Sequence, residues 1–168
     1  MDAAVTLVDS RYEEWARRFA GMAALFAPVV PGADIEHIGS TAVPDLPAKD
    51  VVDLLVGVEA ADAVVPTARL LQAAGFDLEG EREHHSWLSA PDRHHRAYVL
   101  HVVARGSRSW NRRLAFRDLL RADAGARQRY LRVKEEAARS AQSWDDYTRA
   151  KSAVVEALLA PAQPPPTP

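Results

Sequence analysis

One acidic residue in the middle of an apolar run limits what this chain can fold into. Residues 51–56 have the pattern of a buried strand, and Asp53 stands near its centre. A carboxylate is costly to remove from water unless it is paired, protonated or open to a cleft. We interpret Asp53 as a site residue that faces a cleft. The alternative is a structural ion pair with Lys49 or an arginine.

The loop before this run has the residues of an anion-binding bend. A shorter apolar run at residues 35–38 is followed directly by Gly39, Ser40 and Thr41. A Gly-Ser turn after a strand lets the backbone approach a phosphate, to which its amides and hydroxyl can donate hydrogen bonds. Lys49, further along the loop, can hold phosphate charge. Its other interpretation is that of an ion-pair partner for the neighbouring aspartates.

Length and composition indicate one ordinary globular domain. A chain of 168 residues suits a single core. We expect one domain over residues 1–160 and a disordered proline-rich tail over residues 161–168. The net charge of -2 favours neither nucleic acid nor an anionic membrane as a partner, and no apolar run is long enough to span a bilayer. The lack of cysteine excludes disulfides and thiol chemistry, and fits a cytoplasmic protein.

The order of the patterns predicts an α+β fold. A helix is expected after Ser10, which with Glu13 forms a capping-box pattern. Strands are expected at the two runs above, a helix at residues 59–74, one further strand at residues 76–90 and another at residues 97–104. Helical periodicity then continues to residue 159. Because the helices gather at the end, we expect a mixed or antiparallel sheet backed by helices, with a helical C-terminal part.

Several stretches together resemble the GrpB family. They are EHIGSTAVP at residues 36–44, LPAK at 46–49 with Asp53, LAFRDLLR at 114–121, Tyr130-Leu131 with Lys134, and His101. The resemblance runs from about residue 10 to residue 159. The GrpB family is similar to the minimal nucleotidyltransferase superfamily, which implies a small mixed sheet backed by helices. In some bacteria a GrpB-like segment is fused behind dephospho-CoA kinase.

The same resemblance implies a metal site that this chain only partly matches. In the superfamily, two carboxylates two positions apart on a strand hold magnesium, and a later strand supplies a third. Asp53 occupies the second position, but Val51 occupies the first, and His101 stands where the third is expected. Asp53 and His101 are therefore the expected ligands of a single metal ion, Mg²⁺, with no bound metal as the alternative.

The resulting functional hypothesis is a protein that binds a nucleotide or another phosphorylated ligand at the Gly-Ser loop, with metal-dependent nucleotidyl transfer. Asp53 and Lys49 are the expected catalytic residues. The expected ligand contacts are Gly39, Ser40, Thr41, His37, Arg117, Arg121 and Lys151. One alternative is a catalytically inactive domain of the same fold that binds a ligand or another protein. A further alternative is a histidine–metal hydrolase.

Two adjacent histidine pairs open one more possibility. His84-His85 and His94-His95 flank a predicted turn, and a hairpin there would bring the pairs together as a candidate transition-metal site. Adjacent residues on a strand point to opposite faces, however, so one pair cannot turn both rings to the same ion. We therefore favour His37 and His101, which lie in the strands beside the Gly-Ser loop and Asp53.

Overall fold

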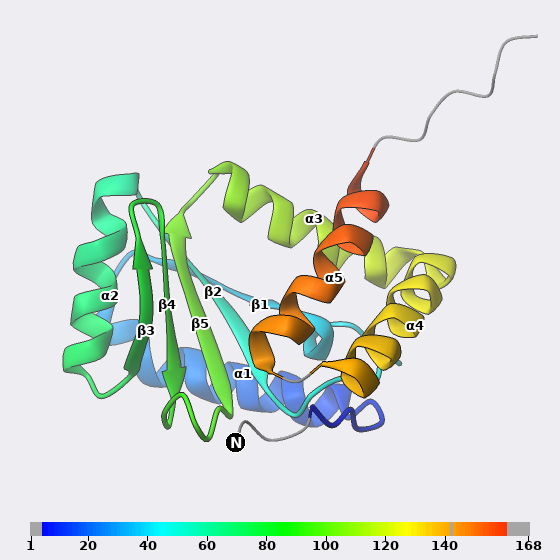
Figure 1. Ribbon diagram of the computed structural model, residues 1–168. Helices are drawn as coiled ribbons and strands as arrows, with labels where there is room; N and C mark the ends of the chain where they lie inside the picture. Colours follow the sequence, from blue (N-terminus) through cyan, green and yellow to red (C-terminus); the bar gives the residue numbers. More distant parts are fainter. Residues whose placement is uncertain (1–4, 142, 161–168) are drawn as a thin grey trace, which may run out of the picture.

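The computed structural model describes residues 5–141 and 143–160. In this part, five strands form one sheet in the order β1-β2-β5-β4-β3 (Figure 1). The strands are β1 Asp34–Ile38, β2 Val52–Val58, β3 Asp77–Arg82, β4 His85–Ala90 and β5 Tyr98–Ala104. The central strands β2 and β5 are parallel and all other neighbours are antiparallel. The predicted α+β fold with a mixed sheet is confirmed. The tail at residues 161–168 lies outside the described residues.

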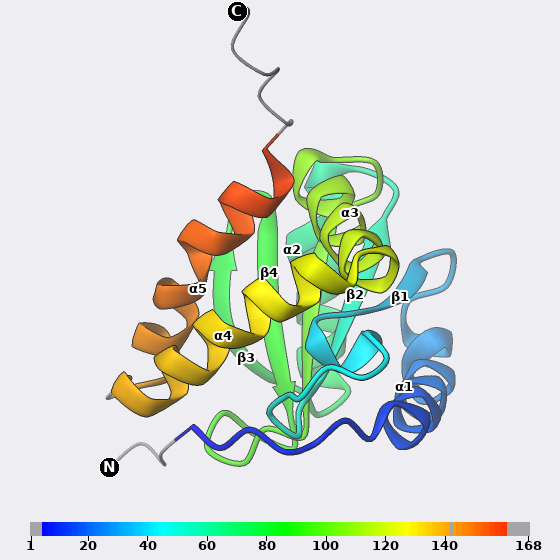
Figure 2. The same cartoon turned by 90° about the vertical axis from the view of Figure 1, so that its right-hand side faces the viewer.

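Helices cover both faces of the sheet. They are α1 Tyr12–Phe26, α2 Val64–Ala73, α3 Arg108–Ala122, α4 Ala124–Ser140 and α5 Trp144–Leu159, with short turns η1 Ala27–Val29, η2 Ser40–Ala42 and η3 Ala61–Ala63. Helices α1 and α2 pack on one face, and α3, α4 and α5 form a layer over the other (Figures 1 and 2). Across the described ranges, no helix has both the length and the apolar character to span a bilayer.

Strand alternation in β2 decides which residues reach each helical layer. Val52, Leu54 and Val56 are fully buried against α1 and α2. The residues between them therefore face the other layer. In register, Asp53 pairs with Ile38 of β1 and with Val99 of β5. Strand β2 thus presents the Asp53 carboxylate towards α3, α4 and α5.

Three local predictions were wrong. Residues 76–90 were expected as one strand, but they form the β3–β4 hairpin. The run expected to end at residue 56 continues to Val58, because Gly57 still pairs with both neighbouring strands and Val58 with β5; the Trp110 ring of α3 packs against Gly57. The Ser10 capping box is absent: α1 begins at Tyr12, and Arg11 before it makes no side-chain capping hydrogen bond.

A second hydrophobic cluster holds the helical layer in place. It joins the loop after β1 to α3 and α4 through Val43, Leu46, Leu120, Ala126 and Tyr130. Part-buried residues of α5, among them Val154 and Leu158, pack against the same cluster. Because the loop and the helices share this cluster, the Gly-Ser bend, which begins the same loop, is fixed relative to α4 and α5.

Candidate functional site

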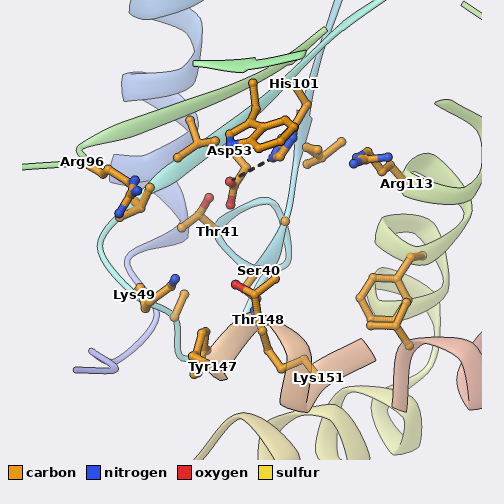
Figure 3. A pocket seen from close by; sticks show the side chains of 18 of the residues that line it. Ser40, Thr41, Lys49, Asp53, Arg96, His101, Arg113, Tyr147, Thr148 and Lys151 are labelled. Carbon is orange, nitrogen blue, oxygen red and sulfur yellow. Dashed lines mark ion pairs between the residues drawn. The ribbon is translucent and has the colours of Figure 1, made fainter. Parts of the chain in front are cut away.

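A cavity of about 530 Å³ lies between the sheet and the layer formed by α3, α4 and α5 (Figure 3). Its polar walls come from separate elements. Asp53 belongs to β2, His101 to β5, Lys134 to α4, and Tyr147 and Lys151 to α5. The Gly-Ser bend closes one side. Segments from across the whole chain therefore meet in one space.

Asp53 stands against the Gly-Ser bend. Its side chain is 31% exposed, so the carboxylate opens into the cavity rather than being sealed in the sheet. Gly39 has a φ of 74°, and a Cβ atom built on it would lie 2.5 Å from Asp53 Oδ2. The positive φ and the contact with the carboxylate both require glycine here. Ser40 and Thr41 follow directly and line the same cavity.

His101 is oriented by two neighbours that sequence reasoning did not assign to the site. His101 Nδ1 lies 3.0 Å from His85 Nε2, and Arg113 Nη2 lies 3.5 Å from the same His85 nitrogen. These contacts orient the His101 ring with Nδ1 towards His85 and Nε2 towards Asp53.

Asp53 and His101 lie beside each other in the cavity wall. His101 Nε2 is 3.8 Å from Asp53 Oδ1, which is too long for a direct hydrogen bond (Figure 3). Burial lowers the pKa of His101 from its ordinary value, and burial lowers the pKa of His85 to about 3. Both rings are thus neutral at pH 7. A carboxylate beside a neutral imidazole can take up a proton or contribute to a cation site.

Three ammonium groups lie on the opposite side of the cavity. Lys49 Nζ is 4.6 Å and Lys151 Nζ 4.2 Å from the centre of the Tyr147 ring. Lys134 Nζ donates to the carbonyl oxygen of Pro47 at 2.5 Å. Burial, and secondly the charge of Lys151, lowers the pKa of Lys49 to about 6 and that of Lys134 to about 7.

The structure brings seven of the expected site residues together. They are Gly39, Ser40, Thr41, Lys49, Asp53, His101 and Lys151, all of which line the cavity. Their shared position follows from the strand–bend–strand unit, to which β5 and α5 add one residue each.

The structure does not bring the remaining three to the cavity. His37 precedes Ile38 on β1 and so points to the opposite face, where it stacks on Phe19 with ring centres 4.9 Å apart. Arg117 pairs with Glu36 at 2.6 Å. Arg121 Nε donates to the carbonyl oxygen of Ala42 at 2.9 Å. The two arginines thus hold β1 and the bend, and His37 supports Thr41 from behind through a 3.0 Å contact between Nε2 and Oγ1.

The paired histidines do not form a hairpin metal site. His84 lies in the β3–β4 turn, whereas His94 and His95 lie beyond the other end of β4. The backbone amides of His94 and His95 donate to the carboxylate of Asp92. Because a whole strand separates the pairs, they cannot share an ion.

The donor set around Asp53 fits at most one metal ion. Over residues 5–141 and 143–160, no group of three or more His, Asp and Glu side chains is placed to hold a metal. Glu79 lines the cavity but is bound on both carboxylate oxygens by Arg96, at 2.7 and 2.5 Å. Val51 lines the cavity where a second carboxylate was sought. A magnesium ion on Asp53 would need ligand oxygens and water to complete its shell.

Sequence comparison connects the whole described domain to one family. The family model described as GrpB protein matches residues 4–160. A UPF0157 protein of Deinococcus radiodurans is 41% identical over 145 residues, which is 86% of this chain and 76% of that protein. Another UPF0157 protein, from Streptomyces coelicolor, is 40% identical over 74% of this chain, which spans 66% of that relative. A dephospho-CoA kinase of Mycobacterium bovis is 35% identical over 64% of this chain, but over only 33% of the kinase.

Comparison with solved structures also finds a GrpB protein. The crystal structure of GrpB from Enterococcus faecalis matches with a TM-score of 0.73 and 24% identity, over 90% of this chain and 98% of that one. Cid1, described by its RNA terminal uridylyl transferase activity, matches with a TM-score of 0.53 and 15% identity, over 78% of this chain and 40% of Cid1. Another match is the Cid1 poly(U) polymerase with MgGTP bound, with a TM-score of 0.53 and 14% identity, over 86% of this chain and 49% of Cid1. These likenesses show a shared fold, and the chain belongs to the GrpB family.

Proposed function

We propose that this protein binds a nucleotide or another phosphorylated ligand in the cavity, with the phosphates against Gly39 and Ser40. The observation that carries the proposal is that the glycine bend, the Asp53 carboxylate and the lysines all face one space. Its volume of about 530 Å³ lies within the range usual for small-molecule sites. The nucleotide-bound complex of a protein with this fold adds support.

The bend is suited to hold phosphate oxygens. Gly39 carries no side chain, so an anion can approach the backbone closely. The Ser40 hydroxyl beside it can donate a hydrogen bond. Thr41 is held by its contact with His37, so its position does not depend on the ligand. We propose that Gly39, Ser40 and Thr41 contact the phosphate oxygens, and that Lys49 and Lys151 neutralise the phosphate charge.

We further propose nucleotidyl transfer as the reaction. An acceptor hydroxyl would attack the α-phosphorus of a nucleoside triphosphate, the bond to the β-phosphate oxygen would break, and pyrophosphate would leave. Asp53 is placed to take the proton of the acceptor hydroxyl, and Lys49 to offset charge on the phosphates. A Mg²⁺ ion bound to Asp53 would supply further charge stabilisation.

Binding without transfer is the second candidate. The observation that favours it is that β2 brings only one carboxylate to the cavity: Val51 reaches the cavity beside Asp53, where an apolar side chain can neither hold a metal nor take a proton. On this reading the protein keeps the ligand cavity and carries out no chemistry. The two candidates share the binding step and differ only in turnover.

One experiment tests both candidates. Binding of ATP, GTP, CTP and UTP with magnesium is measured for the wild type and for Asp53→Asn, and transfer of labelled nucleotide is followed in parallel. Asp118→Asn is the matched control, because Asp118 lies on the surface of α3 and is 58% exposed. Transfer that Asp53→Asn abolishes supports the enzyme, and binding without transfer supports the second candidate. If no nucleotide or phosphorylated compound binds to the wild type, the proposal fails.

A further inference from the structure

All three lysines of this chain line the same cavity. Lys49 comes from the loop before β2, Lys134 from α4 and Lys151 from α5, and every other basic residue except histidine is an arginine. The three lysines lie far apart in the sequence, so the fold alone brings them together (Figure 3 shows Lys49 and Lys151 beside Tyr147). A chain rich in arginine thus places its only lysines around one enclosed space.

Such a cluster is unfavourable in the absence of an anion. Like charges in a partly closed space repel each other, and burial removes their hydration. The rings of Tyr147 and Tyr130 offset part of this cost through cation–π contacts. The charged groups that act on Lys49 are Lys151, Asp53, Arg96 and Lys134, and those that act on Lys134 are Lys151, Asp53 and Glu135. Of the two acids, Asp53 alone lines the cavity.

We propose that Lys49, Lys134 and Lys151 bind the phosphate chain of the ligand directly and supply the positive charge that the second ion supplies in two-metal transferases. The inference rests on the proposed binding of a phosphorylated ligand, and it names the groups that neutralise the negative charge of that ligand. It follows that a triphosphate binds to this protein without any divalent cation. It also follows that the cavity selects ligands with several negative charges over neutral or singly charged ones.

Proton uptake is a consequence of this arrangement. In the free protein the lowered pKa values of Lys49 and Lys134, about 6 and about 7, leave both groups largely neutral at pH 8. A polyphosphate beside them stabilises their charged forms and raises both pKa values. Binding at pH 8 therefore takes up protons, and affinity falls as pH rises above about 7. The charge of Asp53, which lines the same cavity, opposes the effect of burial and raises the pKa of both lysines.

The test uses ATP and inorganic tripolyphosphate as probes. Titration calorimetry is run with EDTA and with magnesium, at about 150 mM salt so that loose surface attraction is screened. Two buffers with different ionisation enthalpies report proton uptake at pH 8. The variant is Lys151→Gln. The matched control is Arg149→Gln, which removes a charge from the same helix at a side chain that is 79% exposed.

The expected result is binding in EDTA with proton uptake, weakened about tenfold or more by Lys151→Gln and unchanged by Arg149→Gln. Binding that requires magnesium and is the same in Lys151→Gln as in the wild type overturns the inference and leaves the proposed function standing. If neither probe binds under any condition, the inference fails. If nucleotides and other phosphorylated compounds also fail to bind, the proposed function fails as well.

Discussion

The carboxylate of Asp53 lies directly against the Cα atom of Gly39: a Cβ atom added there would stand 2.5 Å from Asp53 Oδ2. The central strand and the bend after β1 are therefore in contact at the point where the proposed chemistry takes place. Any side chain at Gly39 must displace the acid. Gly39 also has a φ of 74°, so its replacement disturbs both the bend and Asp53.

We predict that Gly39→Ala lowers the free energy of unfolding by roughly 1–3 kcal/mol, because the positive φ and the contact with Asp53 both disfavour a Cβ. Ligand binding should weaken at the same time. Gly21→Ala on α1 is the control: nothing lies within 4 Å of its Cβ position, and it should stabilise the helix by about 0.5–1 kcal/mol. Urea unfolding of both variants measures the difference, and equal stability of the two would contradict the prediction.

Lys49→Met should stabilise the ligand-free protein while it weakens ligand binding. The pKa of Lys49 is lowered to about 6, mainly by burial, so between pH 6 and the unfolded value of 10.5 the unfolded state binds more protons than the folded state. Wild-type stability therefore contains a term that increases with pH across this window. Removing the group should add at least about 1 kcal/mol at pH 7. Urea unfolding at pH 7 and pH 9 tests this, and a variant less stable than wild type at pH 7 would count against it.

Acid should destabilise the protein through His37 between pH 6.5 and about pH 4. Burial lowers the pKa of His37 from 6.5 to about 4, so the unfolded state takes up a proton that the folded state refuses. Stability should fall by up to about 3 kcal/mol as pH drops from 7 to 4. His37→Gln removes this term. Unfolding free energies over this pH range should fall less steeply for the variant, and parallel curves would refute the assignment.

Tyr147→Phe separates stability from binding. The Tyr147 hydroxyl is buried and has no hydrogen-bond partner among the described residues, although its ring lines the cavity. An unsatisfied buried hydroxyl is destabilising, so Phe should raise stability by about 1 kcal/mol. Loss of the Tyr147 hydroxyl should weaken ATP binding if a phosphate or ribose oxygen accepts a hydrogen bond from this hydroxyl. Thermal unfolding with and without ATP measures both effects, and a loss of stability without ligand would contradict this account.

The part of the site predicted from sequence is the part encoded locally. Asp53 stood out because a charged residue interrupts an apolar strand, and Gly39 and Ser40 because they follow a strand directly. These features lie within one short stretch, and strand alternation was enough to place Asp53 facing a helical layer. The same alternation places His37 on the opposite face, one position from Ile38, and applying it strictly would have excluded His37 from the cavity.

The rest depends on tertiary structure that no local pattern reveals. His85 reaches His101 only because residues 76–90 fold as a hairpin, and Glu83-His84 is not a typical turn sequence. Lys134 and Tyr147 reach the cavity through the packing of α4 and α5 on the loop after β1. The sequence holds two signals for Lys134: its place in the GrpB-like stretch with Tyr130 and Leu131, and the scarcity of lysine in an arginine-rich chain.

Helix α5 supplies Tyr147 and Lys151, and none of its described side chains belongs to the main hydrophobic core between the sheet and the α1 and α2 layer. It is held mainly by α4 and α3, at the edge of the cavity. Substitutions along its inner face can therefore change which molecule is accepted while the strands that carry Asp53 fold as before. Ligand preference can therefore diverge among related proteins through substitutions in this one helix.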